Sequence, residues 1–250
     1  MLTQTELDYR NWCDVLDFPS LDERQTHNAR TFIMRLTDGS LPKPLYRHQY
    51  EAIMRVIYHG EKLGKWDSLL DIVTGGGKTV IMSALIAYFR QVRGYTKFLI
   101  LVPGTIVRER VKDDFEPRNP GFAYRDFPLF FPPYHHIPDM LSTVVLRDRL
   151  SSASIKDADI IIANIHQLYE NKASENLELL LTDTITPNIV IFNDEAHNAS
   201  AMQYREVLKL LRRKTVARVD LTATPYRLDK QDLDTYPPIY EYHIQEAMKE

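Results

Sequence analysis

The sequence has little of several features, and each shortage narrows what the protein can be. A single cysteine, Cys13, among 250 residues rules out an internal disulfide framework and a metal site built from several cysteines. Apolar runs such as 98–102 and 189–192 are far shorter than the roughly 20 residues that cross a bilayer. The first residues lack the basic and apolar regions of a secretory signal. We therefore expect a soluble, cytoplasmic protein that does not bind a membrane.

An excess of positive charge is also missing. Lys and Arg total 31 against 34 for Asp and Glu, which gives a formal net charge of -3. A protein with this balance must bind a polyanion through local patches, because its overall field does not attract one. The 44% of hydrophobic and 26% of charged residues are ordinary values, so we expect a globular chain, with one large domain or one domain carrying a smaller appendage, rather than disorder.

The succession of apolar patterns predicts an α/β fold. Short continuous runs typical of buried strands alternate with longer helical patterns, which is the arrangement of a mostly parallel sheet with helices on both faces. We expect helices over about 4–38, with Ser20 and Glu23 as a capping box, and near 52–60. The predicted strands are 69–73, 98–102, 159–163, 188–192 and 216–221, and further helices are predicted at 78–90, after Gly104, near 175–181 and at 202–211.

Two stretches interrupt this pattern. Residues 117–138 contain six prolines and many aromatic residues, so we predict an ordered insertion. Its aromatic side chains could stack nucleic-acid bases or pack against the sheet, and we favour packing. The predicted organisation is therefore a helical N-terminal segment over 1–40, a main domain over 41–228 and an exit linker over 229–250.

The sequence TGGGKT, residues 74–79, follows a predicted strand and precedes a predicted helix. Thr74, Gly75, Gly76 and Gly77 let backbone N–H groups converge on one concavity at a helix N-terminus, which attracts phosphate. Lys78 would reach the β and γ phosphates of a nucleotide, and the Thr79 hydroxyl would bind Mg²⁺. Ile72 replaces the first glycine of the usual P-loop pattern.

Two further motifs stand at predicted strand ends. In FNDEAHN, residues 192–198, Asp194 could hold Mg²⁺ and Glu195 could accept a proton from an attacking water. In LTATP, residues 221–225, Thr222 and Thr224 could form hydrogen bonds towards His197. Taken singly, a solvated acidic turn and threonines chosen for β propensity are at least as good interpretations.

The order TGGGKT, DEAH, TAT resembles the first RecA-like domain of superfamily-two helicases and translocases. LYRHQYEAI at 45–53, ILVPG at 100–104 and IIIANIHQLYE at 160–170 are similar to three further motifs of that group. The combination is most similar to the motor subunit of type III restriction enzymes. The resemblance covers about residues 45–228.

The resemblance implies a P-loop NTPase domain that uses ATP and Mg²⁺ for movement on DNA. It gives Lys78, Asp194, Glu195 and His197 as catalytic residues and Thr222 and Thr224 as coupling residues. The implied nucleotide-binding residues extend to Gln49, which would contact the adenine edge, and Arg47, near the base. The residues implied to lie near nucleic-acid phosphates are Pro103, Gly104, Asn164 and His166.

Partners follow from the same resemblance. Arginine fingers of such motors lie on a second RecA-like domain with a pattern like Q-x-x-G-R-x-x-R, which does not occur in these 250 residues. We therefore expect a second RecA-like domain in a longer chain, little ATP turnover by this chain alone, and double-stranded DNA and a methyltransferase or other restriction-type subunit as partners. An RNA helicase domain and an ATP-responsive, non-catalytic scaffold are the alternatives.

Overall fold

The protein contains a parallel sheet that carries the predicted strand-end motifs. The computed structural model describes residues 3–146, 152–168, 173–183, 185–186, 188–194, 202–223 and 237–247. These residues form a seven-stranded sheet of order β3-β4-β2-β5-β6-β1-β7, and every neighbouring pair is parallel. The strands are β1 (Asp67–Ile72), β2 (Phe98–Val102), β3 (Thr143–Val145), β4 (Ile160–Asn164), β5 (Ile189–Asp194), β6 (Thr215–Thr222) and β7 (Tyr240–Tyr242). The predicted α/β fold is therefore confirmed.

The central strands are apolar throughout because both faces of the sheet are covered. Phe98, Ile100 and Val102 of β2 belong to one hydrophobic cluster, whereas the alternate residues Leu99 and Leu101 belong to another. Successive side chains of a strand point to opposite faces, so one continuous apolar run supplies two cores.

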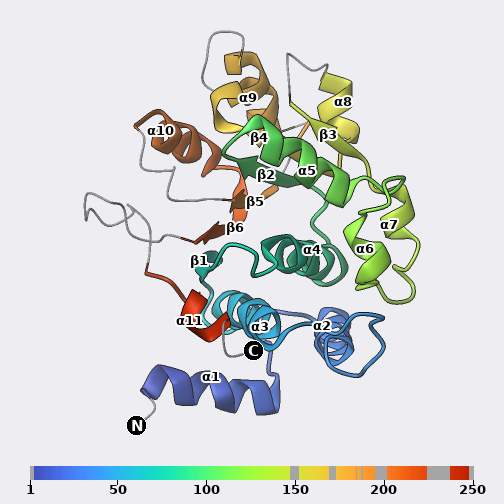
Figure 1. Cartoon of the computed structure of the whole chain (residues 1–250), viewed down its shortest axis with the longest axis vertical. Helices are drawn as coiled ribbons and strands as arrows, with labels where there is room; N and C mark the ends of the chain where they lie inside the picture. Colours follow the sequence, from blue (N-terminus) through green and yellow to red (C-terminus); the bar gives the residue numbers. More distant parts are fainter. Residues whose placement is uncertain are drawn as a thin grey trace.

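Helices cover both faces (Figure 1). The first cluster contains side chains from α2 (Glu23–Arg35), α3 (Arg47–Glu61), α4 (Lys78–Tyr88) and α5 (Thr105–Phe115). The second contains side chains from α8 (Ser152–Asp157), α9 (Ala173–Leu181) and α10 (Met202–Leu211). Three further helical segments are η1 (Phe89–Arg93), η2 (Ile165–Leu168) and α11 (Ile244–Ala247).

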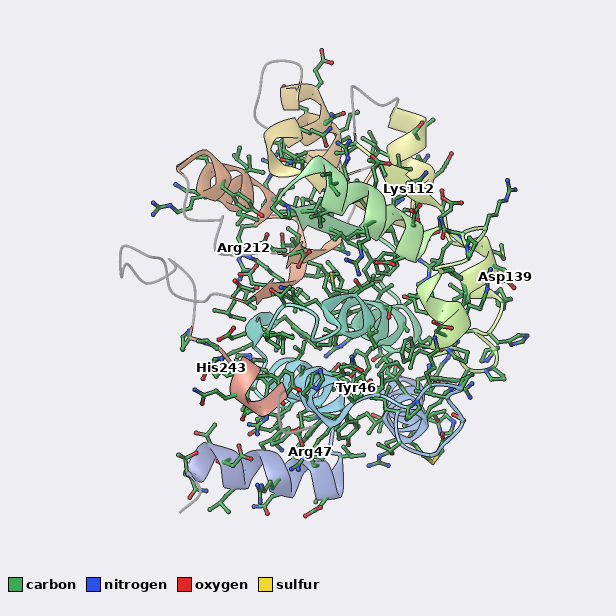
Figure 2. All side chains as sticks on the ribbon, viewed as in Figure 1. Tyr46, Arg47, Lys112, Asp139, Arg212 and His243 are labelled. Carbon is green, nitrogen blue, oxygen red and sulfur yellow. The ribbon has the colours of Figure 1, made fainter. Side chains whose placement is uncertain are left out.

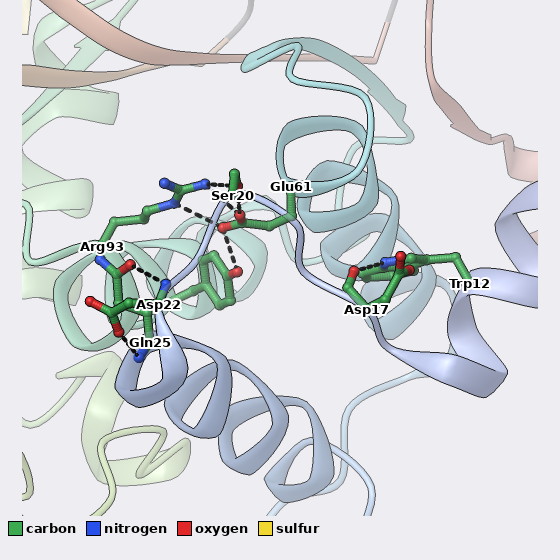
Figure 3. Close-up of polar contacts among 8 residues, drawn as sticks. Trp12, Asp17, Ser20, Asp22, Gln25, Glu61 and Arg93 are labelled. Atoms are coloured by element: carbon green, nitrogen blue, oxygen red, sulfur yellow. Dashed lines mark hydrogen bonds and ion pairs between the residues drawn. The ribbon is translucent and has the colours of Figure 1, made fainter.

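The N-terminal residues are helical within the predicted range 4–38 and form two helices, α1 (Gln4–Val15) and α2. The capping box of α2 lies two residues later than predicted: Asp22 and Gln25 form it, not Ser20 and Glu23 (Figure 3). Ser20 instead donates a hydrogen bond to the buried carboxylate of Glu61 at 3.0 Å. An aspartate is as good an N-cap as a serine, and it leaves Ser20 for this tertiary contact.

Glu61 ties the N-terminal layer to the main domain. Its side chain is fully buried and forms an ion pair with Arg93 of η1 (Figure 3). The Tyr88 hydroxyl donates to Glu61 Oε1 at 2.7 Å. Phe32 of α2 packs edge-on against Tyr88, with ring centroids 5.4 Å apart. The helices before residue 40 therefore share the core of the sheet domain; the proposed division at residue 40 stays a prediction.

The insertion at 117–138 packs against the domain. Phe122, Tyr124, Phe130 and Phe131 are all buried, which agrees with packing in preference to base stacking. Tyr124 also donates a hydrogen bond to the carbonyl of Ser83 in α4 at 2.9 Å. The insertion contains the short helices α6 (Ala123–Asp126) and α7 (Ile137–Met140).

The chain returns to the sheet near its end, which the sequence did not indicate. β7 pairs in parallel with β1, and Val73 N donates to Tyr242 O at 3.0 Å. The predicted linker over 229–250 thus contains a strand, and its role as a linker remains a prediction. None of the helices described is long and apolar enough to cross a membrane.

Candidate nucleotide-binding site

The loop between β1 and α4 has the conformation that the glycine-rich motif predicts. Gly75 and Gly77 have φ values of +86° and +80°, a region that residues with a side chain avoid, and Gly76 N donates to Val73 O at 2.9 Å. Thr74 is exposed in this loop, and Lys78 and Thr79 are the first two residues of α4. A loop of this shape at the first N–H groups of a helix is a kind of site that can hold a phosphate.

Two neighbouring residues of α3 hold this loop in place. His48 Nε2 lies 2.9 Å from Gly76 O, and Gln49 Nε2 donates to the same carbonyl at 3.5 Å. Gln49 Oε1 accepts from Tyr46 N at 3.1 Å, so the Gln49 side chain is buried against the loop. A Cβ atom on Gly77 would lie 2.1 Å from Gln49 Nε2. Arg47 is exposed beside them, and base contacts by Gln49 and Arg47 stay predictions.

An aromatic stack beside the loop was missed in the sequence. The His48 ring stacks on Tyr242 with centroids 3.8 Å apart and on Tyr46 at 5.7 Å. His48 and Tyr242 also line a cavity of about 730 Å³ between α1, α3 and β7, together with Arg47. Figure 2 shows Tyr46, Arg47 and His243 in one region around α3 and α11. Tyr46 and His48 flank the glutamine motif in sequence, but nothing local indicates that Tyr242 joins them.

A second residue that the sequence did not indicate is Asp71, a carboxylate of β1. It is 1% exposed, and neither oxygen has a hydrogen-bond partner among the residues that the structure describes. His243 Nδ1 lies 3.4 Å from its Oδ2. Burial raises the pKa of Asp71, while the charges of His243 and Lys78 act in the opposite direction.

The other two motif strands end next to β1. β6 lies between β1 and β5, with Thr222 opposite Asp71 and Leu221 opposite Asp194. Asp194 ends β5 and Thr222, which is fully buried, ends β6. The carboxyl ends of these parallel strands therefore meet at the edge that carries the loop. Glu195, His197 and Thr224 lie outside the described residues.

A buried polar network connects the ends of β5 and β6. Asn193 Nδ2 donates to Asp220 Oδ1 at 3.1 Å, and Arg218 Nε donates to the same oxygen at 2.8 Å. The hydroxyl of Tyr204 in α10 donates to Asn193 Oδ1. Burial raises the pKa of Tyr204, so the tyrosine stays protonated as a donor. This network fixes the residues next to Asp194 and Thr222.

Three of the four residues predicted to lie near nucleic acid, Pro103, Gly104 and Asn164, lie close together in the structure. Pro103 and Gly104 connect β2 to α5, and Asn164 ends the adjacent strand β4. Asn164 Nδ2 donates to Pro103 O at 3.0 Å, so the side chain of Asn164 braces this loop. His166 lies in η2; its side chain is outside the described part of the chain.

Oxygen donors suited to Mg²⁺ are available. The Thr79 hydroxyl and the Asp194 carboxylate are hard oxygen ligands of the kind that Mg²⁺ prefers. Within the described ranges, no three His, Cys, Asp or Glu residues form a group that could enclose a metal ion.

The parallel sheet and the glycine-rich loop after β1 have the architecture of the RecA-like domains of helicases. A sequence profile described as "Type III restriction enzyme, res subunit" matches residues 42–227. The chain therefore belongs to the type III restriction enzyme Res subunit family. The match leaves out α1, α2, β7 and α11, although β7 contacts the loop.

Individual relatives agree with this family. The chain is 28% identical over 137 residues to the "Probable type III restriction-modification enzyme HindVIP Res subunit" of Haemophilus influenzae, covering 53% of this chain and 24% of that protein. It is 30% identical over 183 residues to the "Putative ATP-dependent helicase IRC3" of Saccharomyces cerevisiae, covering 70% and 22%. The chain thus spans about a quarter of the length of these relatives.

A solved structure shows the same fold. A nuclease-deletion mutant of the type ISP restriction-modification enzyme LlaGI, in complex with a DNA substrate mimic, has a TM-score of 0.55 at 16% identity, covering 83% of this chain and 20% of that one. At this identity the likeness concerns the fold alone.

Proposed function

We propose that the chain is the ATP-binding half of a motor that hydrolyses ATP to move on double-stranded DNA. The observation that carries the proposal is the meeting of three features at one sheet edge: the glycine loop after β1, Asp194 at the end of β5 and Thr222 at the end of β6. Such a strand-end arrangement beside a phosphate loop is typical of nucleotide-driven motors.

The loop residues bind the phosphates. The N–H groups around Gly75 to Gly77 and at the start of α4 point their positive ends at an anion, and Lys78 adds a full charge. His48 and Gln49 both contact the Gly76 carbonyl, which fixes the position of this loop residue. Gln49 and the exposed Arg47 would contact the base.

Thr79 and Asp194 would hold Mg²⁺ with the nucleotide. When bound, the ion neutralises charge that develops on the phosphates. Asp194 is presented at a fixed place, because the preceding residue, Asn193, is hydrogen-bonded to Asp220 and Tyr204. The start of α4 would thus position Thr79, and the hydrogen-bonded end of β5 would position Asp194.

Hydrolysis and coupling are assigned to the residues that follow these strands. Glu195 would accept the proton of the attacking water, with His197 beside it. Thr222 and Thr224 would pass the state of the γ-phosphate to the DNA-binding face. That face would include Pro103, Gly104, Asn164 and His166, of which Pro103 and Asn164 are joined by a hydrogen bond.

Partners outside this chain belong to the same proposal. A second RecA-like domain would supply arginine fingers, whose contribution can reach roughly 10³- to 10⁵-fold in rate. A methyltransferase or other restriction-type subunit is the partner that the family suggests. DNA is favoured over RNA because the Haemophilus influenzae relative carries a restriction-modification name and the LlaGI structure holds a DNA substrate mimic.

The first test is binding of a fluorescent ATP analogue with Mg²⁺, followed by titration of ATP turnover against duplex DNA. We expect tight binding by the native chain, binding reduced at least about tenfold in Lys78→Ala, and native binding in Lys65→Ala, which removes an exposed lysine as a charge-matched control. Turnover should be slow, should rise when the second RecA-like domain and DNA are added, and should vanish in Glu195→Gln.

Each alternative function predicts a different result. A chain that binds ATP but never turns it over, even with the second domain and DNA, would be a scaffold or switch. Stimulation by duplex RNA but not by duplex DNA would indicate an RNA helicase, since the 2′-OH distinguishes the two polymers. Equal binding by the native chain and Lys78→Ala would contradict the nucleotide site itself.

A further inference from the structure

We propose that Asp114, in α5, is a positioning residue that orients the Thr79 hydroxyl for the Mg²⁺–nucleotide complex. The inference rests on the proposed function, because it concerns the same phosphate site. Its observation is independent of the motifs: Thr79 Oγ1 donates a hydrogen bond to Asp114 Oδ2 at 3.3 Å.

The contact joins two separate elements of the fold. Thr79 lies in the first turn of α4, and Asp114 lies one residue before the end of α5. Both side chains are partly buried. Phe115, the next residue, is fully buried, and its carbonyl accepts a hydrogen bond from the Thr143 hydroxyl of β3 at 2.8 Å. The end of α5 is therefore anchored to the sheet, and Asp114 meets Thr79 from a fixed position.

The chemistry of a hydroxyl explains why this contact matters. A threonine hydroxyl has one hydrogen to donate and two lone pairs to offer. Because the hydrogen points to Asp114, the lone pairs point away from α5 and stay available for a cation. A carboxylate that accepts a hydrogen bond from a metal ligand also makes that ligand a better donor to the metal.

The contact also links the two candidate surfaces. α5 begins immediately after Pro103 and Gly104, which are candidate phosphate contacts for DNA, and its 11 residues span about 16 Å. One end of α5 therefore lies at the candidate DNA surface, and the other end touches the residue that would bind Mg²⁺. Asp113, next to Asp114, is exposed and has the same charge, so it provides a matched control.

The experiment measures the affinity of the native chain for a fluorescent ATP analogue in Mg²⁺ and in EDTA. In Asp114→Ala the gain in affinity that Mg²⁺ provides should fall about tenfold, with the affinity in EDTA unchanged. Asp114→Asn keeps one acceptor oxygen and should retain part of the gain. Asp113→Asn should behave like the native chain in both buffers.

Other outcomes overturn the proposal in distinguishable ways. If Mg²⁺ strengthens binding equally in the native chain and both Asp114 variants, this inference is wrong and the nucleotide site stands. If both variants weaken binding equally in Mg²⁺ and EDTA, Asp114 supports the fold rather than Thr79. Thermal unfolding of each variant shows whether it is folded. If Asp114→Ala is not folded, the binding data of Asp114→Asn test the proposal instead. A native chain that does not bind the analogue at all contradicts both proposals.

Discussion

The loop after β1 and the paired ends of β5 and β6 lie at the same edge of the sheet, but they are held in different ways. The loop depends on backbone: Gly75 and Gly77 adopt positive φ, and His48 and Gln49 contact a carbonyl from outside. The strand ends depend on buried side chains, with Asp220 bonded to both Asn193 and Arg218. The loop is thus held through contacts to its backbone, whereas the strand ends are held by a network of buried side chains.

The largest expected effect is on the network. Asp220→Ala would leave the Arg218 guanidinium, whose side chain is 18% exposed, and the Asn193 amide without their shared acceptor. Losing one partner of a buried ion pair costs about 3–5 kcal/mol of unfolding free energy, because the other charge remains buried. Urea denaturation of Asp220→Ala and the native chain measures this difference.

The control for the network is a pair at the surface. Lys43 and Asp126 form an ion pair in which both side chains are more than half exposed, so Asp126→Ala should cost less than about 1 kcal/mol. Equal costs for Asp220→Ala and Asp126→Ala would mean that the strand ends are not held by the network.

The next effect concerns the loop. Gly77→Ala places a methyl group about 2.1 Å from Gln49 Nε2 and forces an L-residue to φ +80°. The left-handed conformation alone costs about 1–2 kcal/mol, so we expect ATP affinity to fall about tenfold or more in an equilibrium binding titration. Gly94 has φ +71°, but no atom lies within 4 Å of an added Cβ. Gly94→Ala therefore has the backbone strain of a positive φ without a steric clash of the methyl group. Equal ATP affinity in Gly77→Ala and Gly94→Ala would show that the Gln49 side chain moves aside to accommodate the added methyl group.

The loop could be predicted from the sequence, whereas the network could not. The loop was predictable because its glycines, Lys78 and Thr79 are consecutive, and β2 was predicted at 98–102 because an apolar run between polar segments marks a buried strand. The network was not: Asn193 and Asp220 look like polar interruptions of apolar strands, and only the register of β5 and β6 pairs them.

The other features that the sequence analysis missed or misplaced could not be identified from the local sequence pattern. Ser20 with Glu23 and Asp22 with Gln25 both satisfy the capping-box pattern, and the tertiary contact of Ser20 with Glu61 distinguishes them. Asp114 cannot be told from Asp113 in a helix of mixed charge. The stacking of Tyr242 on His48 requires the chain to return as β7, which no nearby residue indicates.

A smaller effect is expected when Tyr204 of the network is changed. Tyr204→Phe removes the hydroxyl that donates to Asn193 Oδ1 and leaves that buried acceptor without this donor. We expect a loss of about 1–2 kcal/mol in unfolding free energy, below that of Asp220→Ala, because no charge is left unpaired. The Mg²⁺-dependent affinity for ATP should fall further in Tyr204→Phe than in Tyr95→Phe, a variant of a tyrosine that packs on Phe89 of η1. The same affinity in both would mean that Asn193 keeps Asp194 in place without Tyr204.

The smallest effect lies between the two regions, at Asp71, which stands opposite Thr222 and two residues before the loop. Burial raises its pKa, so the folded protein holds the proton more tightly than the unfolded chain does. This contribution to stability is present below the ordinary aspartate pKa and is lost as the pH rises through the raised pKa. Asp71→Asn should therefore gain stability relative to the native chain as the pH rises above the ordinary aspartate pKa of about 3.9, as measured by urea midpoints. If the native chain gains instead, the ion pair with His243 outweighs burial, and β7 is held to β1 by charge as well as by backbone hydrogen bonds.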